Sequence, residues 1–244
     1  EASPLQEEGF LGPAKLTGPA RLELGLTLPL EKEPKADVFG QVALQGARFQ
    51  ARPDTPALEG VTGRITFSGK TIDSEALRGR LLGQPVDLAF QRQPDRPFTI
   101  GLSGRLPAER LRAVLHRRGV PLSLEHYVNG VVDADLGVTW GKDQRRFRLE
   151  ADLRELALAF PDPAFKARGE PAALTVTGEL NGPPVVEARL ATETDQWRLR
   201  YAPGSAPAVG VAVGWGQAAP VPQAGRVRLA GEVARLPLRQ WLAL

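Results

Sequence analysis

The residues of this chain that are best equipped for chemistry are two histidines and two aspartates. His116 and His126 are the only histidines among the 244 residues, and they are not at the spacing of a metal-ligand pair. Asp133 and Asp135 stand two residues apart in an alternating segment, so both carboxylates project from one face of a strand. Paired carboxylates can act as general acid and base. We interpret these two as a solvated strand face and the histidines as solvated or capping residues.

Other catalytic signatures are missing from the sequence. Cysteine is absent, which excludes thiol nucleophiles, disulfide scaffolds and cysteine-based zinc sites. The sequence has no Gly-x-Ser-x-Gly elbow, no loop of alternating oxygen ligands for calcium, and no glycine-rich phosphate loop between a strand and a helix. A hydrolase would need inward-facing carboxylates, which the strands lack. We therefore expect a protein that is not an enzyme and that has no cofactor and no metal.

Arginines cluster around one segment of helical period, residues 107–118. They are Arg105, Arg110, Arg112, Arg117 and Arg118. The aromatic residues belong to the apolar strand faces, so the stacking platforms of single-strand nucleic-acid binding are missing. A solvated helix face is the better interpretation, and we expect no nucleic-acid partner. If the arginines do have a partner, anionic lipid head groups are as plausible as phosphodiesters.

The elements that position these residues are strands. In residues 61–90, Gly63, Ile65 and Phe67 face one way, Gly69 suits a tight turn, and after a polar link Val86 begins a second alternating run. The same alternation predicts about a dozen strands, in residues 20–30, 38–44, 61–67, 86–90, 98–106, 132–140, 147–153, 156–160, 174–177, 186–190, 197–201, 209–213 and 227–229. Gly46 is predicted to form a bulge. Residues 107–118 and 238–242 are predicted as short helices.

The second half of the chain echoes the first. Residues 22–28 resemble residues 134–140, and the Leu-Pro step that precedes the first predicted helix recurs at Leu236-Pro237. We predict two β-meander units, residues 16–118 and 128–244, each closed by a helix, after a poorly ordered lead-in over residues 1–15. Edge strands of such units can pair and extend one sheet.

Several motifs resemble the YhdP-like members of the AsmA-like family of bacterial periplasmic proteins. The most specific is Leu82-Gly83-Gln84-Pro85-Val86, which follows the Gly-x-Ile-x-Phe run at 63–67. A strand that begins at Gly18-Pro19 and ends at Leu28-Pro29-Leu30 precedes it, and Gly104, Leu106, Pro107 and Leu111 match the motif that follows. The resemblance covers residues 16–115 well and the rest loosely.

The resemblance implies a curved hydrophobic β-groove (a β-taco) that carries phospholipid between the inner and outer membranes. It implies a periplasmic location, a parent chain anchored in the inner membrane, and neighbouring segments joined by edge-strand pairing. Membranes would be reached only through parts outside these residues. The side chains expected to line the groove are Leu24, Leu26, Val42, Ile65, Phe67, Leu88, Phe98, Ile100, Leu136, Val138, Leu149, Leu174, Val176, Val186 and Leu199.

The pattern alone leaves a second possibility open. Alternating strands can also hide their apolar faces by packing into a ligand-free scaffold or interaction module. A charge at Val138 would abolish lipid loading of a groove but unfold a packed core, because an unpaired buried charge costs several kcal/mol. The sequence has no apolar run long enough for a membrane helix, so we expect any membrane anchor to lie outside these residues. It has no methionine, so we expect a piece of a longer chain.

Overall fold

The computed structural model describes residues 15–27, 37–51, 53, 55–117, 127–142, 144–161, 164–180, 185–203, 206–214, 216–232 and 237–241. The prediction of a mainly β protein is confirmed. The chain divides into two compact units. The first contains the described residues of Glu1–Gly104 together with Gly137–Arg145, and the second those of Arg105–Leu136 together with Arg146–Leu244.

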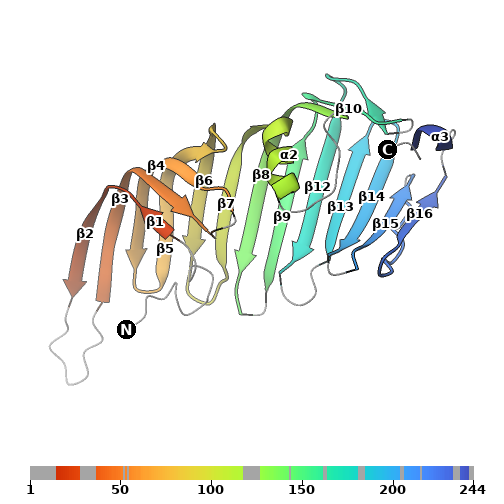
Figure 1. Ribbon diagram of the computed structural model, residues 1–244. Helices are drawn as coiled ribbons and strands as arrows, with labels where there is room; N and C mark the ends of the chain where they lie inside the picture. The colour runs from red at the N-terminus through yellow and green to blue at the C-terminus, as the bar shows by residue number, and fades with distance from the viewer. Residues whose placement is uncertain are drawn as a thin grey trace. The chain divides into compact units, whose positions relative to one another are not determined.

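The first unit is an antiparallel meander (Figure 1). One edge of β3 pairs with β4, and β5, β6 and β7 follow β4 in sequence order. β1 and β2 also pair with β3. The strands are β1 (Lys15–Thr17), β2 (Ala20–Thr27), β3 (Asp37–Gln50), β4 (Leu58–Ser68), β5 (Thr71–Leu81), β6 (Gln84–Arg92) and β7 (Phe98–Pro107), and the unit includes β7 through Gly104.

The polar link predicted between the two runs of residues 61–90 is wrong, because these residues form a full strand, β5. The register against β6 shifts between Asp73 and Leu77, and Ala76 has a φ of 49°. Such a bulge breaks the two-residue alternation on which a strand prediction depends. Ile72 and Leu77 therefore both pair with β6, although they are an odd number of residues apart and regular alternation would place them on opposite faces.

The end of β3 bends over the apolar face of its own sheet. A register shift between Gln45 and Ala47 confirms the bulge predicted at Gly46. The rings of Phe49 on β3 and Phe90 on β6 meet edge to face, with centroids 6.2 Å apart. β3 and β6 are three strand spacings apart, roughly 14 Å in a flat sheet. The bend therefore encloses a core, formed by Leu44, Ala47, Leu58, Val61, Leu77, Val86, Leu88 and Phe98.

The second unit combines a large sheet with a small one (Figure 1). β9 pairs with β12, and the intervening β10 pairs instead with β11 and with β8. The elements are α2 (Ala108–Arg117), β8 (Val128–Trp140), β9 (Arg145–Asp152), β10 (Leu156–Ala159), β11 (Phe165–Lys166), β12 (Ala172–Glu179), β13 (Val186–Thr192), β14 (Gln196–Ala202), β15 (Ala208–Val213), β16 (Val227–Gly231) and α3 (Leu238–Trp241). The second unit includes β8 through Leu136 and β9 from Arg146, and the β8–β9 hairpin end belongs to the first unit.

The core of the second unit lies at one end of its strands. α2 contributes Ala108 and Leu111 to this core, and Leu156 and Leu158 of β10 pack in the same cluster. The other buried members are Val132, Ala151, Leu153 and Ala172. α2 lies within the predicted helical segment 107–118, with Glu109 in its first turn, where a negative charge suits the helix dipole. α3 is a four-residue turn inside the predicted segment 238–242.

The last strand departs from the predicted antiparallel meander. β16 runs parallel to β15, so the chain must cross over between them. The crossover passes over the face of β15 that carries Ala208, Gly210 and Ala212. A Cβ added at Gly210 would lie 2.0 Å from the carbonyl oxygen of Pro220. Only glycine permits this approach, and the opposite face of β15, with Val209 and Val211, stays free of the crossover.

We predict that Gly210→Ala destabilises the second unit by about 1–3 kcal/mol, because the new methyl group must displace the crossover. Urea denaturation followed by tryptophan fluorescence measures this change. Gly101→Ala is the matched control, since its Cβ would meet only the Ala89 methyl group at 3.6 Å. Equal midpoints for the two variants would contradict the close packing of the crossover.

Candidate functional site

The candidate site is built from rows of side chains that register places side by side on one sheet face of the second unit. The Val176 row crosses six strands, β9 and β12 to β16, and consists of Leu149, Val176, Ala188, Leu199, Val211 and Leu229. The Gly178 row consists of Phe147, Gly178, Val186, Tyr201, Val209 and Val227. The Leu174 row consists of Ala151, Leu174, Leu190, Trp197, Val213 and Gly231. Every member is apolar or glycine, apart from the hydroxyl of Tyr201.

The three rows differ in what covers them. Ala151, Leu174 and Leu190 of the Leu174 row pack against the cluster under α2 and β10. The Val176 and Gly178 rows contribute no residue to that cluster, and their members are mostly half-buried. On β16 the exposure rises to 76% for Val227 and 59% for Leu229. The covered end and the open rows therefore belong to one continuous apolar face.

The first unit has an apolar face of the same kind. Register places Leu22 beside Val42 and Ile65, and Leu24 beside Gly40, Phe67 and Ile72. The bent end of β3 covers one end of this face. At β2 the face is open, where Leu22, Leu24 and Leu26 are 56–62% exposed.

The fifteen residues predicted to line a groove lie in different environments. Leu24 and Leu26 are exposed, while Leu88 and Phe98 are buried in the core of the first unit. The remaining eleven are half-buried. Register brings together Val42 with Ile65, and Leu149 with Val176 and Leu199.

Several members of the open rows are not among the residues predicted to line a groove. Val211 and Leu229 complete the Val176 row, and Phe147, Tyr201 and Val209 belong to the Gly178 row. Their alternation is visible in the sequence, but only the register of six strands shows that they continue rows begun elsewhere.

The opposite face of each unit is charged. Ion pairs cross neighbouring strands, at 3.4 Å between Arg78 and Asp87 and at 2.8 Å between Arg200 and Glu187. Others join Arg64 to Glu75 and Arg105 to Asp133. All these side chains are more than a third exposed, so each pair adds little stability, of the order of 0–1 kcal/mol. Their effect is to keep this face hydrated.

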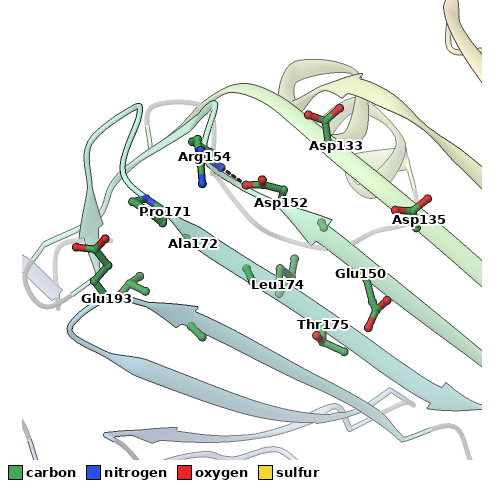
Figure 2. Close-up of a pocket in the computed structure, with 14 residues that line it drawn as sticks. Asp133, Asp135, Glu150, Asp152, Arg154, Pro171, Ala172, Leu174, Thr175 and Glu193 are labelled. Atoms are coloured by element: carbon green, nitrogen blue, oxygen red, sulfur yellow. Dashed lines mark hydrogen bonds between the residues drawn. The ribbon is translucent and has the colours of Figure 1, made fainter.

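The two aspartates of the sequence analysis lie on that charged face, in an open hollow of about 580 Å³ (Figure 2). Asp133 is paired with Arg105 at 3.2 Å, and Asp135 lies beside it along β8. The oxygen Oδ1 of Asp152 accepts a hydrogen bond from the backbone N–H of Arg154 at 2.8 Å. Among the described residues, no group of three or more acidic or histidine side chains is arranged to hold a metal ion. This hollow fits the predicted solvated strand face.

Neither histidine side chain lies among the residues that the structure describes, so their solvated or capping role stays a prediction. His126 lies outside the described residues, and the side chain of His116 does too, although its backbone belongs to α2. No helix within the described ranges has the length and apolar character needed to cross a bilayer.

Lys166 is the one described lysine that is buried, with 2% exposure. Its Nζ donates hydrogen bonds to the carbonyl oxygens of Leu156 at 2.7 Å and Ala167 at 3.0 Å, and more weakly to Arg154 at 3.4 Å. Burial lowers the pKa of Lys166, and the charges of Glu170, Asp152 and Glu155 oppose that shift. A buried lysine can act as a base or nucleophile, but this one is occupied in joining β11 to the turns around β10.

We predict that Lys166→Met costs about 1–3 kcal/mol of stability, because it leaves buried carbonyl groups without a donor. Since the folded-state pKa is lowered, the unfolded chain binds more protons between that value and the usual pKa of about 10.4. Stability of the parent chain therefore rises with pH through this window, and the variant lacks that contribution. Urea denaturation across alkaline pH tests both points. Exposed Lys15→Met serves as the control, and an unchanged midpoint for Lys166→Met would refute the structural role.

Comparison with known proteins places this chain in a family. The family model described as "YhdP protein" matches residues 1–244. The chain belongs to the YhdP protein family. This confirms the family resemblance seen in the motifs around residues 82–86.

A relative in Escherichia coli (strain K12), "Intermembrane phospholipid transporter YhdP", is 25% identical over 172 residues. The match covers 68% of this chain and 13% of the relative, so the chain spans a small part of that protein's length. No solved structure matches the chain.

Proposed function

We propose that this chain is a lipid-carrying segment of a YhdP-like protein, and that the open apolar rows form the floor of a groove for phospholipid acyl chains. The observation that carries the proposal is the row of apolar side chains that crosses six strands without a polar interruption. The name of the E. coli relative supports phospholipid as the cargo.

The physical chemistry of the rows suits acyl chains. Strands lie about 4.8 Å apart, so a row over six strands extends roughly 24 Å. Contact between apolar surfaces is non-directional and contributes roughly 25 cal/mol for each Å² removed from water. A lipid can therefore slide along such rows without breaking hydrogen bonds, and no catalytic group is required.

In this proposal the sheet separates two environments. Acyl chains lie on the apolar rows, while the opposite face, with ion pairs such as Arg200–Glu187, stays in water. The mechanism is passive partitioning, so direction and energy would come from elsewhere. α2, and in a smaller way α3, would cap the apolar face of their unit, as the sequence analysis expects.

Membership of the family supports a proposed setting. The chain would work in the periplasm as part of a longer protein anchored in the inner membrane. Neighbouring segments would extend the apolar face by pairing with edge strands such as β2 and β16. The two predicted units, residues 16–118 and 128–244, would then be successive lengths of one conduit that maintains the outer-membrane barrier.

Native mass spectrometry of the chain purified from cells, followed by lipid extraction, tests the proposal directly. We expect bound phospholipids of several acyl lengths, because the rows offer no feature that selects one length. A mass without lipid that persists after incubation with liposomes would refute the groove and favour a ligand-free scaffold.

A pair of neighbouring substitutions on β12 tests which face binds. Val176→Asp is expected to lower bound lipid about tenfold or more, because acyl chains cannot solvate the carboxylate. Thr177→Asp, one residue away on the charged face, is the matched control and should leave lipid loading unchanged.

Circular dichroism separates lost binding from lost folding in this pair. Leu24→Asp is a further test variant: the Leu24 side chain is 62% exposed, so we expect the fold to tolerate a charge there. A folded Leu24→Asp or Val176→Asp variant with full lipid loading would contradict the proposed face.

A further inference from the structure

Three hairpin turns of the first unit meet around one basic hollow. The turns are β4–β5, β6–β7 and β8–β9, and Figure 1 shows them at the same end of the strands. The hollow has a volume of about 700 Å³, and its charged lining consists of Lys70, Arg92, Arg96, Lys142 and Asp95. We call these four cations the basic rim. Asp143, which follows Lys142 in the sequence, lies outside the described residues.

The basic rim shares one residue, Arg92, with a row of apolar side chains in the same unit. Arg92 is in register with Ile72, which continues through Phe67 and Gly40 to Leu24. The apolar row across four strands, β2 to β5, thus meets a guanidinium group on the next strand, β6. A surface that changes from hydrocarbon to cation along one row matches a molecule that changes from acyl chain to phosphate.

The β8–β9 hairpin repeats this change at its tip. Val138 and Trp140 share one face of β8, and the guanidinium of Arg145 lies 4.5 Å from the centre of the Trp140 ring. Trp is favoured where an apolar surface meets a wet one. Nε of Arg145 is buried and lacks a hydrogen-bond partner among the described residues. This boundary therefore combines an aromatic ring with a cation whose Nε still lacks an acceptor.

We infer that the basic rim binds the phosphate of phospholipid head groups, and that it favours lipids with net negative charge. The inference rests on the proposed function, since the tails must occupy the apolar face. Four cations and one carboxylate line the hollow, so a zwitterionic head group gains less from it than an anionic one. Exposed lysine and arginine side chains near a lipid surface attract anionic lipid head groups.

A second basic hollow is less suited to this role. Arg148, Arg189, Arg198 and Arg200 line about 390 Å³ on the charged face of the second unit. Arg148 and Arg200 already pair with Glu150 and Glu187. This hollow opens on the face opposite the apolar rows, so one lipid cannot place its tails on the rows and its phosphate there.

The test is lipid capture from mixed vesicles of phosphatidylglycerol and phosphatidylcholine in equal amounts, with bound lipid quantified by mass spectrometry. The parent chain is expected to enrich phosphatidylglycerol roughly three- to tenfold. The enrichment should fall in high salt, since screening weakens exposed charges. Neutralising the exposed rim in the triple variant Lys70→Gln, Arg96→Gln, Lys142→Gln should abolish the enrichment while total captured lipid stays within about twofold.

The matched control removes the same charge from the opposite face. Its substitutions are Arg80→Gln, Arg189→Gln and Arg228→Gln, all at exposed positions, and it should keep the enrichment. If control and rim variants lose enrichment equally, net charge alone is responsible and the rim is refuted. Rim-dependent capture of inorganic phosphate without lipid would make it a site for free anions, which also overturns the inference.

The outcomes separate this inference from the proposed function. No captured lipid of either kind would refute the apolar face as a carrier, and the rim with it. Equal capture of both lipids by the parent chain would leave the carrier intact and refute the rim alone.

Discussion

The structure depends on strand register. In antiparallel pairing, residues directly opposite each other project to the same face, so each correctly paired strand extends the apolar rows by one member. A slip of one residue would turn a whole strand's apolar set to the charged side. The cross-strand ion pairs of the opposite face, such as Arg78 with Asp87, add a second reason for the same register.

Apolar rows of this length must be covered or occupied, and each unit covers only one end of its own. The first unit does so by bending β3 at the bulge beside Gly46, which brings Phe49 over Phe90. The second uses α2 and β10, packed around Leu156 and Leu158. The buried ends supply a core that holds each sheet, and the remaining rows stay open. The crossover lies on the charged face of β15 and therefore leaves Val209 and Val211 on the apolar face uncovered by it.

The apolar rows and the basic rim would contribute to lipid binding in different ways. Contact between acyl chains and the apolar rows is favourable over the whole buried area and does not depend on where along the rows a chain lies. The rows would therefore let a lipid move, but they give no preference among head groups. The charge of the basic rim acts locally and is screened by salt. It would therefore add a preference for anionic head groups without fixing the acyl chains in place. Lys70 and Lys142 come from turns far apart in the sequence, and only the fold places both at one hollow.

The sequence by itself determined the mainly β class, most strands, the bulge at Gly46, the first helix and the family, because these depend on local alternation and short motifs such as residues 82–86. It did not reveal β5, since a bulge near Ala76 breaks the alternation, nor the parallel pairing of β16, since strand direction leaves no local pattern. Only the tertiary structure decided that Leu88 and Phe98 are buried while Leu24 and Leu229 are exposed. Their side chains are equally apolar, and what differs is whether a bend, a helix or nothing lies above them.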